Sequence, residues 1–185
     1  MATNEKDLRF GQSIMPHLDA AYNLARWLLR NDADAEEAVQ EAFLRAYRFF
    51  GSFRGEDGKA WLFAIVRNTC YSLHGERMGA GMSEEFDEQL HSPVGDSVGA
   101  VGGLCRDPAD IAIEHADRER VNRAIEDLPV VFREVLVMRE LEELSYRKIA
   151  TIVDIPMGTV MSRLSRGRQM LHAALVAMDG KESMK

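Results

Sequence analysis

The sequence lacks any apolar run long enough to cross a membrane. A transmembrane helix needs about 20 consecutive apolar residues, and no stretch of this 185-residue chain approaches that length. Residues 1–10 hold charged and amide side chains, so they do not resemble the apolar centre of a secretory signal either. We therefore expect a cytoplasmic protein that does not insert into membranes.

Cysteine is also scarce. The chain has two cysteines, Cys70 and Cys105, and neither belongs to a CxxC pair. Its five histidines are scattered, so sequence spacing assembles neither a zinc site nor a nucleophile–base pair. We expect two idle thiols in a reducing compartment, no metal or other cofactor, and no catalytic activity.

A net positive charge is missing too, although nucleic-acid binders usually have one. The formal net charge is −7. Residues 79–115 carry eight acidic side chains and one basic one, so this segment accounts for the whole excess, and the parts on either side are nearly neutral. Within 144–178, five basic residues accompany a single acid, Asp154. A local basic stretch of this kind is what phosphate contacts require.

The acidic middle segment has the composition of a linker. It holds six of the 14 glycines, together with Pro93 and Pro108. Like charge and low hydrophobicity keep such a chain extended and unpacked. We therefore predict two domains, residues 1–78 and 112–185, joined by a flexible acidic linker over 79–111.

The first of these domains shows helical periodicity and no strand-like alternation. The spacing predicts a helix over 14–28, a second helix capped by Asp34 with Glu37 as its capping-box partner, and a third helix over 59–74. The second helix is expected to direct five side chains inward: Ala38, Ala42, Phe43, Ala46 and Phe49.

The sequence pattern of the second domain also predicts helices, so the predicted fold class is all-α. Pro108 suits the first position of a helix that continues through Ile125. Leu128-Pro129 separates it from a further helix, which is expected to pack Phe132, Val135, Leu136 and Leu141 inward. Ser145 then caps a short helix, and a last helix covers about 159–178.

The two last helices form a helix-turn-helix pattern, with Gly158 in the predicted turn. At about 100° per residue, an apolar stripe of the second helix lies opposite a polar face made of Ser162, Ser165, Arg166 and Gln169. No Asp or Glu occurs between Pro156 and Met178. Such a face suits the major groove of DNA. The alternative is an ordinary amphipathic helix with a solvated polar face.

Two sets of motifs carry a resemblance to a known family. In the C-terminal part they are Leu144-Ser145-Tyr146-Arg147-Lys148-Ile149-Ala150, the run 156–164 and Arg166-Gly167-Arg168. In the N-terminal part they are the runs 34–43, 53–55 and 61–68. They resemble regions 4 and 2 of the extracytoplasmic-function (ECF) sigma factors, over about 112–176 and 12–78. A region-4 match alone also fits a response-regulator output domain, but both regions in this order are specific.

The resemblance implies a function and a set of partners. It implies a sigma factor, without catalytic activity of its own, that binds core RNA polymerase and promoter DNA. It further implies control by an anti-sigma factor, and we expect a monomer when the chain is free of partners. Two rivals remain open: a stand-alone helix-turn-helix repressor or activator, and a helical adaptor that binds only proteins.

The resemblance also implies roles for residues of region 2. In the family the second helix of this region binds the polymerase, and the matching residues here are Glu37, Gln40, Glu41 and Phe43. For Phe43 a core position is the favoured alternative. In the family, a loop and the last helix of region 2 melt the −10 element and capture one of its bases. The matching residues here are Phe53, Arg54 and Gly55 in the loop and Arg67 and Asn68 on the helix. Phe53 is equally compatible with a structural role as a side chain that fills the core. Asn68 is compatible with a DNA contact or with a buried hydrogen bond.

In region 4 the resemblance assigns −35 recognition to the second helix of the pattern. The matching residues are Thr159, Met161, Ser162, Arg163, Ser165, Arg166 and Gln169. Met161 departs from the family, where a basic residue is common at this position. An apolar side chain can touch a thymine methyl but cannot bond guanine. The end of region 2, around His74 and Arg77, also carries fewer basic residues than family members often have.

Overall fold

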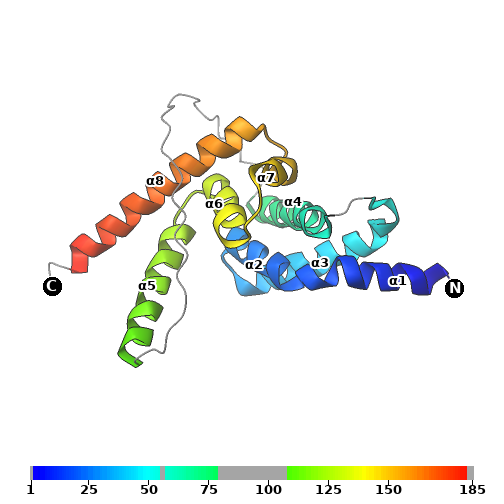
Figure 1. Cartoon of the computed structure of the whole chain (residues 1–185), viewed down its shortest axis with the longest axis horizontal. Helices are drawn as coiled ribbons and strands as arrows, with labels where there is room; N and C mark the ends of the chain where they lie inside the picture. Colours follow the sequence, from blue (N-terminus) through cyan, green and yellow to red (C-terminus); the bar gives the residue numbers. More distant parts are fainter. Residues whose placement is uncertain (1, 55–56, 79–107, 183–185) are drawn as a thin grey trace.

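The computed structural model describes residues 2–54, 57–78 and 108–182 (Figure 1). Every regular element in these ranges is a helix, which confirms the predicted all-α class. The N-terminal helices are α1 Ala2–Ser13, α2 Leu18–Leu29, α3 Asp32–Phe49 and α4 Gly58–Met78, with short turns of 3-10 helix at Met15–His17 (η1) and Phe50–Ser52 (η2). The C-terminal elements are α5 Pro108–Glu126, α6 Val130–Leu136, the π-helical turn η3 Val137–Leu141, α7 Tyr146–Val153 and α8 Met157–Glu182.

Several predicted boundaries differ from the observed ones. Helix α5 begins at Pro108, as its proline predicts, and therefore inside the range assigned to the linker. Most of that range, including Cys105, lies outside the described residues, and so does the candidate residue Gly55 of the loop before α4. Helix α4 runs to Met78 and α8 begins at Met157, so both are longer than predicted. Helix α1 has no counterpart among the predicted helices, because Phe10 is the one residue it buries among those whose side chains are described.

The start of α3 corrects a predicted cap. Asn31, not Asp34, is the N-cap: its backbone is extended and its side-chain oxygen accepts a hydrogen bond from the Asp34 amide at 3.0 Å. Asp34 therefore lies in the first turn of the helix, where its charge still complements the helix dipole. The Ser145 cap of α7 is confirmed, since its hydroxyl accepts from the Lys148 amide at 3.3 Å.

The N-terminal domain closes around an aromatic cluster. Phe10 of α1 meets Phe50 edge to face, with ring centroids 5.3 Å apart, and Phe50 stacks on Phe53 at 5.6 Å. Phe53 in turn lies 5.0 Å from Trp61 of α4. Phe50 is buried and Phe49 is 58% exposed, so the predicted inward position of Phe49 is wrong. The α-helix ends at Phe49, and the tighter turn that follows directs the next ring inward.

The C-terminal domain packs α8 across α6. Val160 and Leu164 are buried, and a Cβ placed on Gly167 would already touch Leu136 and Phe132 at 3.5 Å. Leu141, expected inside, is 48% exposed. The π-helical turn explains this, because the Glu142 amide bonds back five residues to the Val137 carbonyl and the wider turn changes the direction of the side chains.

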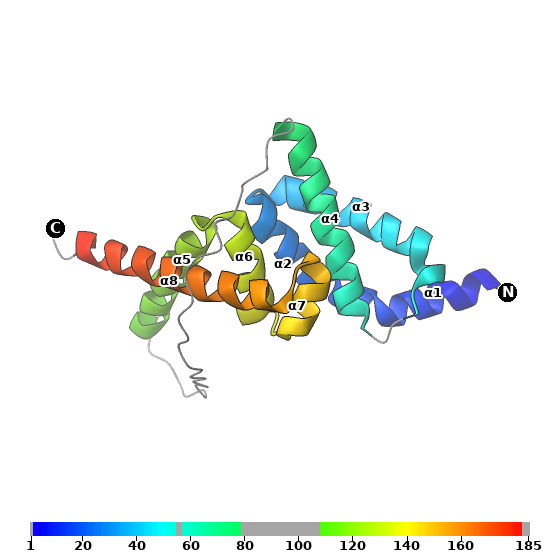
Figure 2. The ribbon, with the colours of Figure 1, turned by 90° about the horizontal axis from the view of Figure 1, so that it is seen from above.

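The two groups of helices lie against each other. Helix α2 contacts α6, and α4 contacts α7, as Figures 1 and 2 show from two directions. Helices α5 and α8 extend away from this contact toward one end of the molecule, and α1 toward the other. The contact between the two groups covers one side of α4, which carries Arg67 and Asn68 of the predicted DNA-binding residues.

Candidate polymerase and nucleic-acid interfaces

The helix-turn-helix consists of α7, a three-residue turn over 154–156, and α8. Asp154 ends α7 in the left-handed conformation, with φ of 58°. Gly158, predicted within the turn, instead lies in the first turn of α8. The reversal therefore depends on an aspartate, which tolerates the left-handed region better than most residues. Buried Val160 and Leu164 then fix the rotation of α8 about its own axis.

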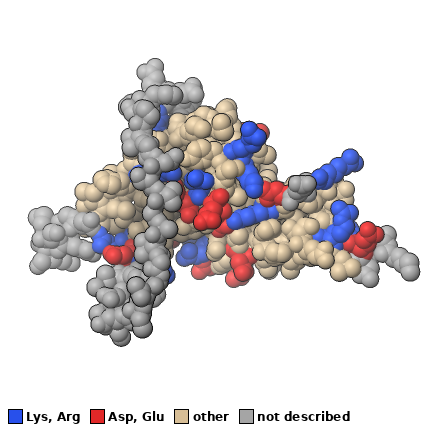
Figure 3. Space-filling model, in the orientation of Figure 1, with Lys and Arg blue, Asp and Glu red and all other residues tan. Residues whose placement is uncertain are grey.

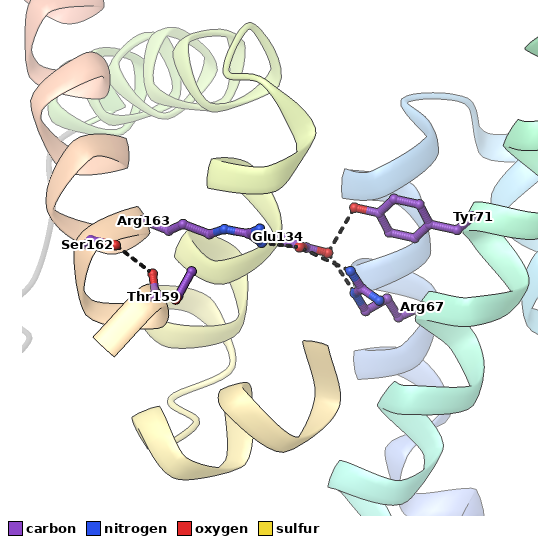
Figure 4. A network of polar contacts seen from close by, with 6 residues as sticks. All are labelled: Arg67, Tyr71, Glu134, Thr159, Ser162 and Arg163. Carbon is purple, nitrogen blue, oxygen red and sulfur yellow. Dashed lines mark hydrogen bonds and ion pairs between the residues drawn. The ribbon is translucent and has the colours of Figure 1, made fainter. Parts of the chain in front are cut away.

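The predicted −35 residues fall on different sides of α8. Met161 and Gln169 are exposed, and Ser165 and Arg166 are half-buried. Thr159 and Ser162 are also half-buried, and the Ser162 hydroxyl donates to the Thr159 carbonyl at 3.0 Å. The side chain of Arg163 instead points toward Glu134 of α6, on the side that faces α4 (Figure 4). The structure therefore brings six of the seven to the open sides of α8 and separates Arg163 from them.

The predicted −10 residues are divided in the same way. Arg54 and Asn68 are exposed, so a buried hydrogen bond does not explain Asn68. Phe53 is half-buried between Phe50 and Trp61, which supports its role as a plug of the aromatic cluster while leaving part of the ring open. The side chain of Arg67 is only 17% exposed, because it turns into the contact between the domains.

The outer face of α3 is open to solvent. Glu37 and Gln40 are exposed, and Glu41 is half-buried and pairs with Arg45 at 2.7 Å. Phe43 is half-buried, with its ring 6.3 Å from that of Phe10, which supports the core position that was favoured for it. Leu44, missed by sequence reasoning, is 64% exposed next to this face. Its spacing of four and three residues from Gln40 and Glu41 is the signal that could have found it.

A buried ionic network lies between the domains (Figure 4). The Glu134 side chain on α6 is fully buried, and it accepts from the Arg67 Nε at 2.8 Å and from the Tyr71 hydroxyl at 3.0 Å. Arg163 of α8 donates to its other oxygen at 3.3 Å. Burial opposes the charged form of Arg67, but the Glu134 carboxylate raises the pKa of this guanidinium above its usual value. Burial, helped by Glu134, raises the pKa of Tyr71, which keeps its hydroxyl as a donor.

Further polar contacts surround this network. Arg133 is buried and donates to the carbonyl of Trp27 in the other domain at 2.8 Å, and burial lowers its pKa. Lys59 pairs with Glu142 at 2.8 Å, and Lys148 pairs with Asp57 at 2.7 Å. On the face seen in Figure 3, basic and acidic side chains lie side by side over the middle of the molecule. Sequence reasoning found none of these contacts as such, since each joins residues far apart in the chain.

Other kinds of site are not supported within the described ranges. Three or more His, Cys, Asp or Glu side chains gather nowhere in them in a way that could hold a metal ion. Burial raises the pKa of the Cys70 thiol to about 12, so this cysteine is protonated and unreactive, in agreement with the predicted idle thiol. No helix in the described part of the chain is both long and apolar enough to span a bilayer.

Comparison with known proteins identifies both domains. Residues 14–77 match the family model of Sigma-70 region 2, and residues 118–171 match that of Sigma-70 region 4. The chain is 36% identical over 139 residues to the ECF RNA polymerase sigma-E factor of Escherichia coli K12, covering 75% of this chain and 72% of the relative. It is 34% identical over 150 residues to the RNA polymerase sigma-H factor of Pseudomonas aeruginosa, covering 77% and 73%.

Solved structures agree with this assignment. The sigma factor RpoE of Bartonella quintana, solved in complex with the anti-sigma factor NepR, superposes with a TM-score of 0.65 at 27% identity, covering 90% of this chain and 96% of that one. CnrH, solved with the cytosolic domain of CnrY, gives a TM-score of 0.61 at 22% identity, covering 92% and 90%, and supports the fold. With two region matches in order and a relative at 36% identity, the chain belongs to the ECF family of RNA polymerase sigma factors.

Proposed function

We propose that this sigma factor binds core RNA polymerase through the outer face of α3. Glu37, Gln40 and Glu41 supply polar groups there, and the exposed side chain of Leu44 adds apolar area beside them. Phe43 supports the face from within through its contact with Phe10. Interfaces of this kind derive most of their affinity from a few large side chains surrounded by polar ones. Leu44 is therefore the strongest single contact we assign to the polymerase.

The −10 element is assigned to the loop before α4 and to the helix itself. Asn68 and Arg54 are exposed, and an amide can read the edge of an unstacked base while a guanidinium holds a phosphate. The half-open ring of Phe53 offers a stacking surface between Phe50 and Trp61. Arg67, next to Asn68, completes the set once the domains separate, and Gly55 belongs to it by its place in the loop.

The −35 element is assigned to α8. Thr159, Met161, Ser162, Ser165, Arg166 and Gln169 occupy the sides of the helix that point away from buried Val160 and Leu164. The observation that carries this assignment is an outward face with no acidic side chain from Pro156 to Met178. Arg163 joins these residues when its contact with Glu134 is released. Met161 favours a base pair that presents a thymine methyl.

Run-off transcription with core polymerase tests the assignment. Arg166→Ala should reduce initiation on a cognate promoter, and a set of single-base −35 variants separates a base contact, which relaxes one position, from a phosphate contact, which weakens all sequences alike. Arg123→Ala is the matched control, because Arg123 is 68% exposed on α5 and pairs with Glu119 of the same helix. Unchanged activity of Arg166→Ala on every variant would show that this face does not meet DNA.

The same proposal covers the setting in which the protein acts. The domains extend over 1–78 and 112–185 with the linker 79–111 between them, and the chain works in the cytoplasm, where polymerase and DNA are. It has no enzymatic activity of its own and is a monomer when free. Because the solved relative RpoE is in complex with the anti-sigma factor NepR, we assign an anti-sigma factor to this chain as well. Nanomolar, sequence-specific duplex binding by the free chain would instead favour a repressor.

A further inference from the structure

Helix α1 is attached to both ends of the loop that precedes α4. At the first end, the Phe10 ring meets Phe50 edge to face at 5.3 Å, and Phe50 stacks on Phe53 at 5.6 Å. At the second end, a Cβ placed on Gly58 would overlap the backbone oxygen of Ser13, the last residue of α1. Since Gly58 is the first residue of α4, α1 bounds the loop on both sides (Figure 2).

The contact at Gly58 leaves no room for a side chain. The Ser13 oxygen belongs to the main chain, so it cannot turn aside as a flexible side chain could. The next residue, Ile14, is fully buried, and its Cδ1 lies 3.3 Å from the position of that Cβ. Glycine allows this close approach of two backbones. The end of α1 therefore has a fixed place against the start of α4.

Phe10 holds the rest of α1 to the domain. Among the side chains of α1 that the structure describes, it is the one that is buried. Its ring also meets two rings of α3 edge to face, that of Tyr47 at 5.4 Å and that of Phe43 at 6.3 Å. Edge-to-face contacts are favourable for aromatic rings. The Tyr47 hydroxyl adds a bond to Asp7 of α1 at 2.6 Å.

Resting on the proposed stacking role of Phe53, we propose that Phe10 is a positioning residue for capture of the −10 base. Phe50 contacts both rings, so Phe10 fixes the ring on which Phe53 is stacked. A binding group acts best when packing already holds it in its productive position. Helix α1 precedes residues 14–77, the segment matched by the model of region 2, so this role lies outside the matched segment.

The rate at which a closed promoter complex becomes open tests the proposal. It is measured with core polymerase saturated by the full-length sigma factor, so that weaker binding to polymerase does not enter the rate. Phe10→Ala should lower this rate several-fold. Leu8→Ala is the matched control, because Leu8 lies on the same helix and is 59% exposed. A wild-type rate in Phe10→Ala, or an equal loss in Leu8→Ala, would overturn the positioning role.

A double-variant cycle separates positioning from a general loss of structure. Phe53→Ala should lower the rate, and Phe10→Ala added to it should lower the rate no further, because Phe10 acts through Phe53. Two independent effects would multiply instead, and that result would overturn the proposal. A normal rate in Phe53→Ala would overturn the −10 role of Phe53 and the positioning role with it. A slow Phe53→Ala beside a normal Phe10→Ala would overturn the positioning role alone.

A change at the other end of the loop keeps the test decisive if Phe10→Ala does not fold. Gly58→Ala forces α1 away from the start of α4, so it should also slow opening. Gly11→Ala is the matched control, since a Cβ at this position on α1 meets nothing within 4 Å. Phe10→Leu keeps an apolar side chain but has no ring, and it should be slow as well. A wild-type rate in either Gly58→Ala or Phe10→Leu would overturn the proposal.

The emission of Trp61 reports the displacement without polymerase or DNA. The chain has two tryptophans, so Trp27→Phe leaves Trp61 as the single one, with its ring 5.0 Å from that of Phe53. In this background Phe10→Ala should shift the emission to longer wavelengths, because Phe53 moves and water reaches the indole. Leu8→Ala should not shift it. Unshifted emission in Phe10→Ala would overturn the link from Phe10 to Phe53, and a shift without slower opening would overturn its part in base capture.

Discussion

The surface assigned to the polymerase and the surfaces assigned to DNA differ in their exposure. On α3, Glu37 and Gln40 are exposed and Leu44 is 64% exposed. On α4 and α8, the side chains of Arg67 and Arg163 are each 17% exposed, because Arg67 reaches across the domain contact to Glu134 and Arg163 pairs with the same carboxylate within its own domain. We therefore expect polymerase binding to need no rearrangement of the free chain, whereas a DNA contact by Arg67 needs the two domains to separate.

The largest effect is expected at the open surface. Leu44→Ala should weaken binding to core polymerase by about 2 kcal/mol, roughly 30-fold, because burying a leucine side chain in an interface contributes about 1.5–3 kcal/mol. Thermal stability should stay the same, since Leu44 packs little within the chain. Titration of core polymerase with fluorescent sigma factor measures this. Leu8→Ala, 59% exposed on α1, is the control, and equal losses in both variants would remove the distinction.

Two neighbouring residues of α4 test the surface that the domain contact partly covers. Asn68→Ala should reduce promoter melting by about 1 kcal/mol, the lower end of the range for one lost base contact, and leave the radius of gyration of the free chain unchanged, because Asn68 is exposed. Arg67→Ala should reduce melting and also expand the free chain, because it removes a partner of Glu134. Permanganate footprinting reports the first property and scattering the second. Identical behaviour of the two variants in both assays would contradict the comparison.

Substitutions in the turn before α8 should have a smaller effect, on the free energy of unfolding. Asp154 holds the left-handed conformation with φ of 58°, which costs a residue with a side chain about 1 kcal/mol relative to glycine. Asp154→Gly should therefore raise the free energy of unfolding by up to about 1 kcal/mol, and Asp154→Val should lower it. Thermal unfolding measures both. A stabilising Val substitution would show that the backbone at 154 differs from the one described.

The smallest effect is expected from pH. The pKa of Asp57 is lowered from 3.8, first by its bond with Lys148 and then by the Ala60 amide. A carboxyl whose pKa is lowered by folding contributes stability above its unfolded value and loses it as the pH falls through the folded one. The free chain, with its two domains in contact, should therefore keep its radius between about pH 5 and 8 and begin to open only below 3.8. Opening near pH 6 would mean that another group controls the contact.

Sequence patterns predicted the helices better than the contacts between them. The stripe through Val160 and Leu164 and the cap at Ser145 were readable because both depend on residues a few positions apart. The cap of α3 was misassigned because Asn31 and Asp34 are both good caps close together. The predicted inward position of Leu141 was wrong because a π-helical turn changes the helical period on which the prediction rests.

The candidate site shows the same limit. Asn68 and Gln169 were predicted from their positions within a motif, and the structure leaves both exposed, while their roles stay predictions. The pairing of Glu134 with Arg67 joins residues 67 positions apart, and no local pattern encodes it. Glu134 directly follows Arg133 in the sequence, and only the fold shows that its side chain is completely buried.

The shared carboxylate also affects where the free protein resides in a cell. A chromosome offers a vast excess of nonspecific sites, and a protein with exposed guanidiniums is distributed over them in proportion to its phosphate contacts. The free chain keeps Arg67 and Arg163 mostly covered and carries a net charge of −7, so we expect bulk DNA to attract it weakly. On the proposed function, we expect a larger share of the free sigma subunits to stay available to the polymerase.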